Sequence, residues 1–108
     1  MEFKKVNWDD FKIKDSIALA DCLNLYKFIT KNRIRFTEAI KRIAFDRNVS
    51  PPSVSANCTS NQFLQVNDWN QLYNNSDNKL VIKKIYDALI RRHPKETSKI
   101  KKIIKLDL

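Results

Sequence analysis

Glycine is absent from the 108 residues of this chain. Average usage would give about seven glycines at this length. Dinucleotide-binding fingerprints, phosphate-cradling loops and calcium-binding hands all need glycine where the backbone turns tightly or approaches a ligand, so these motifs are excluded. Tight β-hairpins with Asn-Gly or Asp-Gly turns are excluded for the same reason, which favours a helical chain.

Residues that ligate metals or carry out catalysis are also scarce. The chain has two cysteines, Cys22 and Cys58, and one histidine, His93. A structural zinc site needs about four nitrogen or sulfur ligands at short spacings, so we expect no metal site. No acid–base pair appears and nothing places His93 near a nucleophile, so we expect neither an enzyme nor a cofactor. The two cysteines are interpreted as reduced, buried thiols.

Long apolar segments are missing as well. No stretch approaches the roughly 18 consecutive apolar residues of a membrane-spanning helix, and no apolar run follows the charged N-terminus as in a signal peptide. We therefore expect a cytoplasmic protein that does not contact a membrane. With 108 residues, 43% of them hydrophobic, residues 1–108 are expected to form one domain.

Positive charge is abundant and unevenly distributed. The chain has 21 Lys and Arg against 12 Asp and Glu, a net charge of +9. Seven bases and two acids give residues 27–47 a net charge of +5, and ten bases and two acids give residues 79–105 a net charge of +8. Residues 48–78 contain no Lys or Arg. Such blocks indicate a polyanionic partner, nucleic acid first; solvated charge on exposed helix faces is the alternative.

Hydrophobic periodicity predicts a single all-α domain of about five helices with a basic C-terminal tail from about residue 94. Capping residues and helix breakers predict the limits of these helices. The first is capped by Asp15 or Ser16 and ends near Lys31, and the second is capped by Thr37 and ends near Arg47. The third begins at Ser50 and Pro51, the fourth is capped by Asn67, and the fifth runs from about Lys79 to His93, where Pro94 ends it. The ends are ambiguous. Residues 11–13 and 104–108 alternate like short strands, as in a winged-helix variant, whereas Ile100, Ile103 and Ile104 suit a last helical turn, which we favour.

Residues 43–59 carry the pattern of a helix-turn-helix. Asn48 stands where this motif usually has glycine, and its short amide side chain is the best substitute for a left-handed turn residue. Val49 is expected to fill the corner, while Val54 and Cys58 point back into the core. The sequence therefore predicts two helices joined at a tight corner.

Residues 49–63 are similar to helix-turn-helix segments of bacterial restriction-type and other DNA-processing proteins. The similarity rests on a Val-Ser-Pro-x-x-Val…Cys-Thr run followed by an aromatic residue, here Trp69. It implies a DNA-binding domain. The sequence departs from the pattern at Arg47, where an apolar residue is usual, and at Asn57, where Ile or Leu is usual. Phe45 falls on the outward face of the preceding helix.

In a helix-turn-helix the second helix of the motif enters the major groove and reads base edges with its exposed side chains. Uncharged residues on the outward face of this helix are predicted to read bases: Ser53, Ser55, Ala56, Thr59 and Ser60. Cations of the two basic blocks are predicted to bind phosphates: Arg33, Arg35, Lys41, Arg42, Arg47, Lys83 and Lys84.

We therefore expect sequence-influenced binding of double-stranded DNA. The protein would act as a small transcription regulator or as the recognition module of a DNA-processing, defence, restriction–modification or mobile-element system, alone, as a homodimer or in a larger complex. Two alternatives stay open. One is a protein-interaction or inhibitory module that binds an acidic protein through Phe45, Trp8 and the basic faces. The other is an RNA or single-strand binder, which the basic tail and the aromatic residues suggest.

Overall fold

The computed structural model describes residues 14–105, and all of their regular secondary structure is helical, which confirms the predicted all-α fold. No strand occurs among these residues, so residues 104 and 105 form no wing; residues 1–13, which include Trp8 and the alternating residues 11–13, and residues 106–108 lie outside the described part. The helices are α1 (Lys14–Thr30), α2 (Phe36–Arg47), α3 (Pro51–Cys58), α4 (Val66–Asn74), α5 (Lys79–Arg92) and α6 (Thr97–Ile103), with a 3₁₀ turn, η2 (Pro94–Glu96), before α6. None of these helices is long and apolar enough to cross a membrane.

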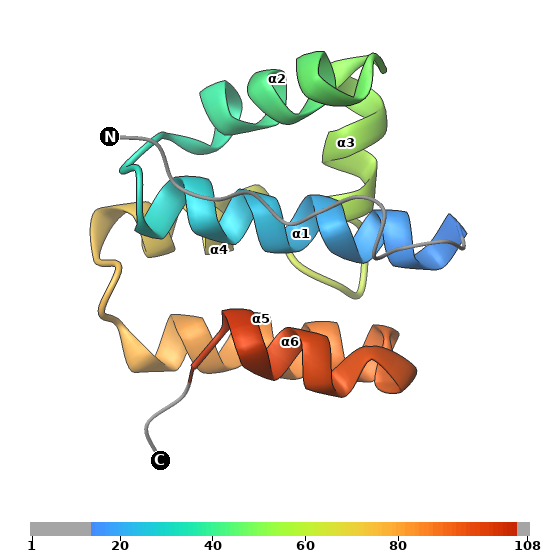
Figure 1. Cartoon of the computed structure of the whole chain (residues 1–108). Helices are drawn as coiled ribbons and strands as arrows, with labels where there is room; N and C mark the ends of the chain where they lie inside the picture. The colour runs from blue at the N-terminus through green and yellow to red at the C-terminus, as the bar shows by residue number, and fades with distance from the viewer. Residues whose placement is uncertain (1–13, 106–108) are drawn as a thin grey trace.

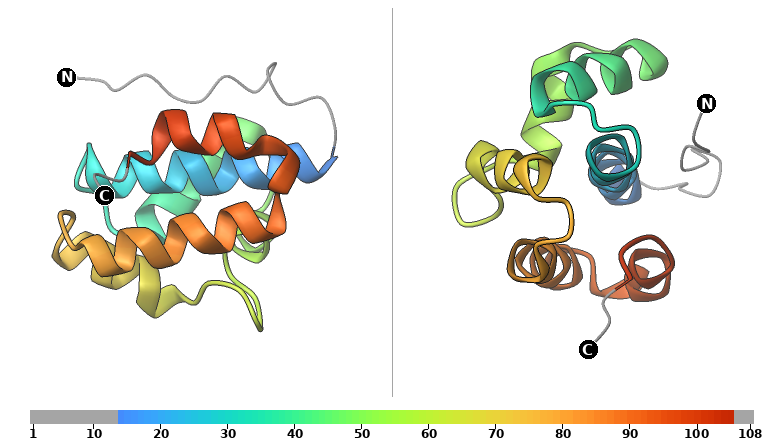
Figure 2. Two further views of the ribbon diagram at one scale, coloured as in Figure 1. Left: turned by 90° about the horizontal axis from the view of Figure 1, so that it is seen from below. Right: turned by 90° about the vertical axis from the view of Figure 1, so that its left-hand side faces the viewer.

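The helices form three layers (Figures 1 and 2). Helices α1 and α4 lie in the middle, α2 and α3 pack on one side of them, and α5 and α6 pack on the other. Helix α1 is buried on almost every side because it packs against α2, α3, α4 and α6. This explains why its sequence is apolar all round rather than along one stripe, with Leu19, Leu23, Leu25 and Ile29 all buried.

Trp69 of α4 is completely buried in the core. Its indole N–H donates a hydrogen bond to the carbonyl oxygen of Cys58, at 3.1 Å. This bond satisfies the one polar group of the ring and a carbonyl at the end of α3, so burying the indole leaves no polar group unpaired. Cys58 and Cys22 are buried free thiols, as expected.

Two predicted N-terminal caps are wrong. Helix α1 begins at Lys14, so Asp15 and Ser16 lie within its first turn. Helix α2 begins at Phe36 rather than after a cap at Thr37. Phe36 is buried in the core whereas Thr37 is exposed, and tertiary packing of the aromatic ring outweighs the local preference of threonine for a cap.

Helix α4 begins at Val66, so the predicted cap at Asn67 is also wrong. The carboxylate of Asp68 accepts a hydrogen bond from the backbone N–H of Gln65 at 2.8 Å, which starts the helix two residues earlier. Asp68 also pairs with Lys84 of α5 at 2.7 Å. One buried acid therefore both starts α4 and joins it to the next helix.

The C-terminal third of the chain folds back on the core. Asn78 caps α5, because its side chain accepts hydrogen bonds from the N–H groups of Leu80 and Val81. His93 ends the helix as predicted, and its backbone N–H donates a hydrogen bond to the carbonyl of Leu89 at 2.8 Å. The helical alternative for the last segment is confirmed by α6. Ile100 and Ile104 are buried, because α6 packs against α1 and α5.

Candidate nucleic-acid interface

Helices α2 and α3 meet at a tight corner formed by residues 48–50. Asn48 has φ 57° and ψ 46°, the left-handed conformation predicted for it. Its N–H donates to the carbonyl of Phe45 at 3.2 Å, and the N–H of Val49 donates to that of Ala44 at 3.0 Å. These bonds satisfy carbonyls that the last turn of α2 would otherwise leave unpaired.

Helix α3 begins as predicted, with Ser50 before it and Pro51 at its first position. The hydroxyl of Ser50 pairs with that of Ser53 at 2.9 Å rather than with a backbone N–H. Val54 and Cys58 are completely buried, as expected. Val49, in contrast, does not fill the corner, because it is 37% exposed.

A buried polar network joins α3 to α1 and α2. One carboxylate oxygen of Asp21, a completely buried residue of α1, accepts from the guanidinium of Arg47 at 2.5 Å. The same oxygen accepts from the side-chain amide of Asn57 at 2.7 Å. Burial raises the pKa of Asp21 to about 6, against the opposing influence of Asn57 and Arg47.

The network contains the two residues at which the sequence departs from the helix-turn-helix segments that it resembles. Arg47 and Asn57 are polar where those segments usually have apolar residues, and both bind Asp21. The thiol of Cys22 donates to the carbonyl of Asn57 at 3.3 Å, which adds a second link between α1 and α3. The Arg47 side chain is only 19% exposed, so the structure places this predicted phosphate ligand mainly in a structural role. Asp21 was missed from the sequence, although an acid between Ala20 and Cys22 in an apolar segment was the available signal.

The predicted base-reading residues differ in exposure. Ser53 and Ala56 are exposed on α3, whereas Ser55, Thr59 and Ser60 are half-buried. The hydroxyl of Thr59 donates to the carbonyl of Ser55 at 2.9 Å. The hydroxyl of Ser60 accepts from the guanidinium of Arg92 at 3.2 Å. The most accessible part of the α3 surface is therefore its uncharged N-terminal half.

Arg33 and Arg35 lie together between α1 and α2, at the far end of α2 from α3. Their guanidinium carbons lie 4.7 and 4.8 Å from the centre of the Tyr73 ring. Arg33 also donates to the carbonyls of Tyr73 and, at 3.5 Å, Ile29. It thereby joins the C-terminal ends of α4 and α1, where a cation is favourable.

The remaining predicted phosphate ligands lie on two sides of the molecule. Lys41 and Arg42 are exposed on α2, and Arg42 is 3.8 Å from Glu38. Lys83 and Lys84 lie on α5, in the opposite layer (Figure 1), and pair with Asp87 and Asp68 at 2.6 and 2.7 Å. The structure therefore does not gather all the predicted cations around α3. It does bring Arg92, which sequence reasoning left out of the site, to the C-terminal end of α3.

Within residues 14–105, no group of three or more His, Cys, Asp or Glu side chains is arranged to hold a metal ion. The features that remain are a rigid corner, an uncharged exposed helix and cations on the helices at either end of it. Neither a protein-family model, nor a curated protein, nor a solved structure matches this chain.

Proposed function

We propose that the protein binds double-stranded DNA, with α3 in the major groove. One observation carries this proposal. Helix α3, which contains no charged residue, is held at a fixed angle to α2 by the Asn48 turn and by the buried bonds of Asp21 to Arg47 and Asn57. A rigid helix that presents small side chains can approach base edges closely.

The side chains exposed on α3 suit the major groove. A serine hydroxyl such as that of Ser53 donates to or accepts from base edges, and the Ala56 methyl group can contact a thymine methyl. Cations lie near α3 at two places: Lys41 and Arg42 are exposed on the adjacent helix α2, and the guanidinium of Arg92 reaches from α5 to Ser60, just after the end of α3. These cations would bind the phosphates beside the groove and supply sequence-independent affinity.

Ala56→Glu tests the orientation of the complex. Position 56 is exposed and glutamate is a good helix former, so we expect the fold to persist. In the groove, the new carboxylate would face the negative potential of the DNA, and we expect affinity for duplex DNA to fall at least about tenfold, or 1.4 kcal/mol. Fluorescence anisotropy with duplex DNA, single-stranded DNA and RNA measures this change.

Asn74→Glu is the matched control. It makes the same charge change at the exposed C-terminal end of α4, which lies at the other end of the molecule from α3 (Figure 1). We expect its affinity to stay within about twofold of wild type at moderate salt, where distant charges are screened. Equal effects of the two variants would refute the placement of α3. Stronger binding to RNA or single-stranded DNA than to the duplex would refute the proposed substrate.

A second candidate function is favoured by one residue. Phe45 is 86% exposed on the outer face of α2, and an exposed aromatic ring is typical of the centre of a protein-binding surface. The second candidate function is recognition of a protein partner through α2. It would be favoured if the protein binds no duplex DNA at low salt.

A further inference from the structure

Exposed cations gather on the outer surface of α5, η2 and α6, the layer opposite α2. We name this the α5–α6 surface. Its cations are exposed and form no ion pair with any residue in the described part of the chain: Lys79, Arg91, Lys95, Lys101, Lys102 and Lys105.

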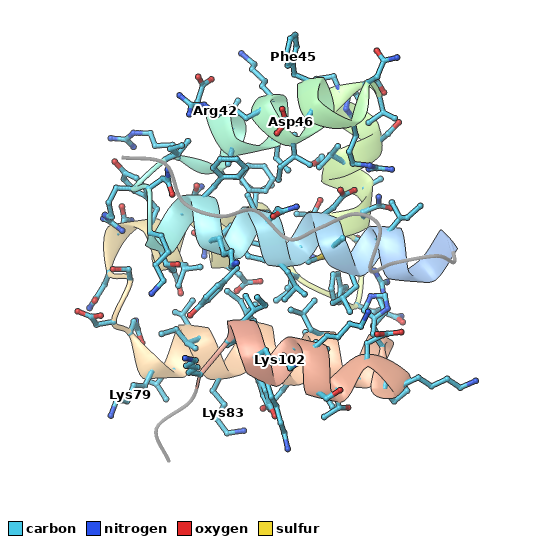
Figure 3. The ribbon with its side chains drawn as sticks, in the orientation of Figure 1. Arg42, Phe45, Asp46, Lys79, Lys83 and Lys102 are labelled. Carbon is cyan, nitrogen blue, oxygen red and sulfur yellow. The ribbon has the colours of Figure 1, made fainter. Side chains whose placement is uncertain are left out.

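The α5–α6 surface is separated from α2 by the middle layer of α1 and α4. Figure 3 shows Arg42 and Phe45 on the outer side of α2, and Lys79, Lys83 and Lys102 on the opposite side of the molecule. The right-hand view of Figure 2 shows the same separation end-on. The exposed cation Arg42 of α2 and the cations of the α5–α6 surface thus lie on separate sides of the molecule.

The charge of the α5–α6 surface is poorly compensated. Residues 79–105 contain ten bases and only two acids, Asp87 and Glu96. Asp87 pairs with Lys83 at 2.6 Å, and Glu96 lies 4.0 Å from Lys99. Uncompensated like charges on one surface repel one another, and a polyanion neutralises them.

The composition of this surface fits a phosphate backbone. Most of its unpaired cations are lysines, whose flexible point charges bind phosphates without fixed geometry. Leu80, at 82% exposure, is the one large apolar residue strongly exposed on the described part of α5 and α6. One leucine offers too little apolar surface for insertion into a membrane interface or for a hydrophobic protein interface.

We propose that the α5–α6 surface binds a second segment of nucleic acid, so that one molecule bridges two DNA duplexes. This inference rests on the proposed binding of a first duplex by α3. The protein measures 29 Å along its shortest principal axis, more than three times the Debye length of about 8 Å at physiological salt. Two duplexes held on opposite sides of it are therefore well screened from each other.

A two-duplex capture assay tests the proposal. One duplex is fixed to beads, a second carries a fluorophore, and the full chain is added at low and moderate salt. We expect wild-type protein to retain the fluorescent duplex, and retention to fall steeply with salt because it depends on released counterions. A parallel anisotropy measurement reports binding to a single duplex.

The decisive variant carries Lys79→Gln, Lys101→Gln, Lys102→Gln and Lys105→Gln. These side chains are exposed and unpaired within the described residues, so we expect the fold to persist, which circular dichroism checks. Capture of the second duplex should fall at least about fivefold while single-duplex affinity stays within about threefold. Lys83→Gln with Asp87→Asn is the control, because it changes two side chains of α5 without changing the net charge.

The outcomes separate the inference from the function on which it rests. Wild-type protein that binds one duplex but captures no second refutes bridging and leaves the proposed function standing. Capture that persists in the quadruple variant also refutes the inference, because bridging would then come from another surface or from self-association. If the quadruple variant loses single-duplex binding while Ala56→Glu retains it, the α5–α6 surface is the primary site and both proposals are wrong.

Discussion

Replacing Asn48 by valine perturbs the corner between α2 and α3 at its most constrained residue. Asn48 has φ 57° and ψ 46°, a region in which the Cβ atom of an L-residue approaches the following carbonyl at a cost of about 1–2 kcal/mol, least for asparagine and most for β-branched residues. The side chain is exposed, so the change leaves core packing intact. We expect the free energy of unfolding to fall by about 1–2 kcal/mol. Asn48→Gly should be as stable as wild type or slightly more stable, because glycine adopts this region without strain.

Urea titrations measure these changes, with the slope of the transition expected to be unchanged. Asn75→Val is the matched control. Asn75 is also exposed and also ends a helix, but its φ of −148° and ψ of 91° lie in the extended region that valine prefers. It loses only an exposed hydrogen bond to the N–H of Asp77, so its stability should stay within about 0.5 kcal/mol of wild type. An Asn48→Val protein as stable as wild type would show that residue 48 is not left-handed and would refute the corner geometry.

Two further predictions concern polar groups that join the helices. Burial raises the pKa of Asp21 from 3.8 to about 6, so the folded protein holds this proton more tightly than the unfolded chain. The free energy of unfolding should therefore fall by about 2 kcal/mol as the pH rises from 4 to 7. Urea titrations at both pH values should find a smaller fall in Asp21→Asn, and an equal fall would contradict the assignment. Arg33→Gln removes hydrogen bonds to the carbonyls of Ile29 and Tyr73 and should lower the free energy of unfolding by about 1–2 kcal/mol. Arg35→Gln loses only its contact with the Tyr73 ring, so its free energy of unfolding should fall by less than about 0.5 kcal/mol. If thermal melts show equal losses of stability in the two variants, the hydrogen bonds of Arg33 do not stabilise the fold.

Features set by neighbouring residues were predictable from the sequence. The absence of glycine and the helical periodicity predicted an all-α fold, which the structure confirms. The left-handed conformation of Asn48 and the start of α3 at Pro51 also follow from local chemistry, because backbone sterics restrict each of these positions within its own turn. The burial of Val54 and Cys58 followed from the apolar face of their helix.

Features that join distant residues were decided only by the tertiary structure. Asp21 lies 26 residues from Arg47 and 36 from Asn57, and no local pattern shows that the two polar residues share one buried carboxylate. The start of α2 at Phe36 likewise depends on a core that forms from the whole chain. The sequence determined that two basic blocks exist, whereas the packing of α1 and α4 decided that α2 lies on the opposite side of the molecule from α5 and α6. The physical reason is that helix formation and turns depend on residues a few positions apart, while burial and the meeting of charges depend on how complete helices pack.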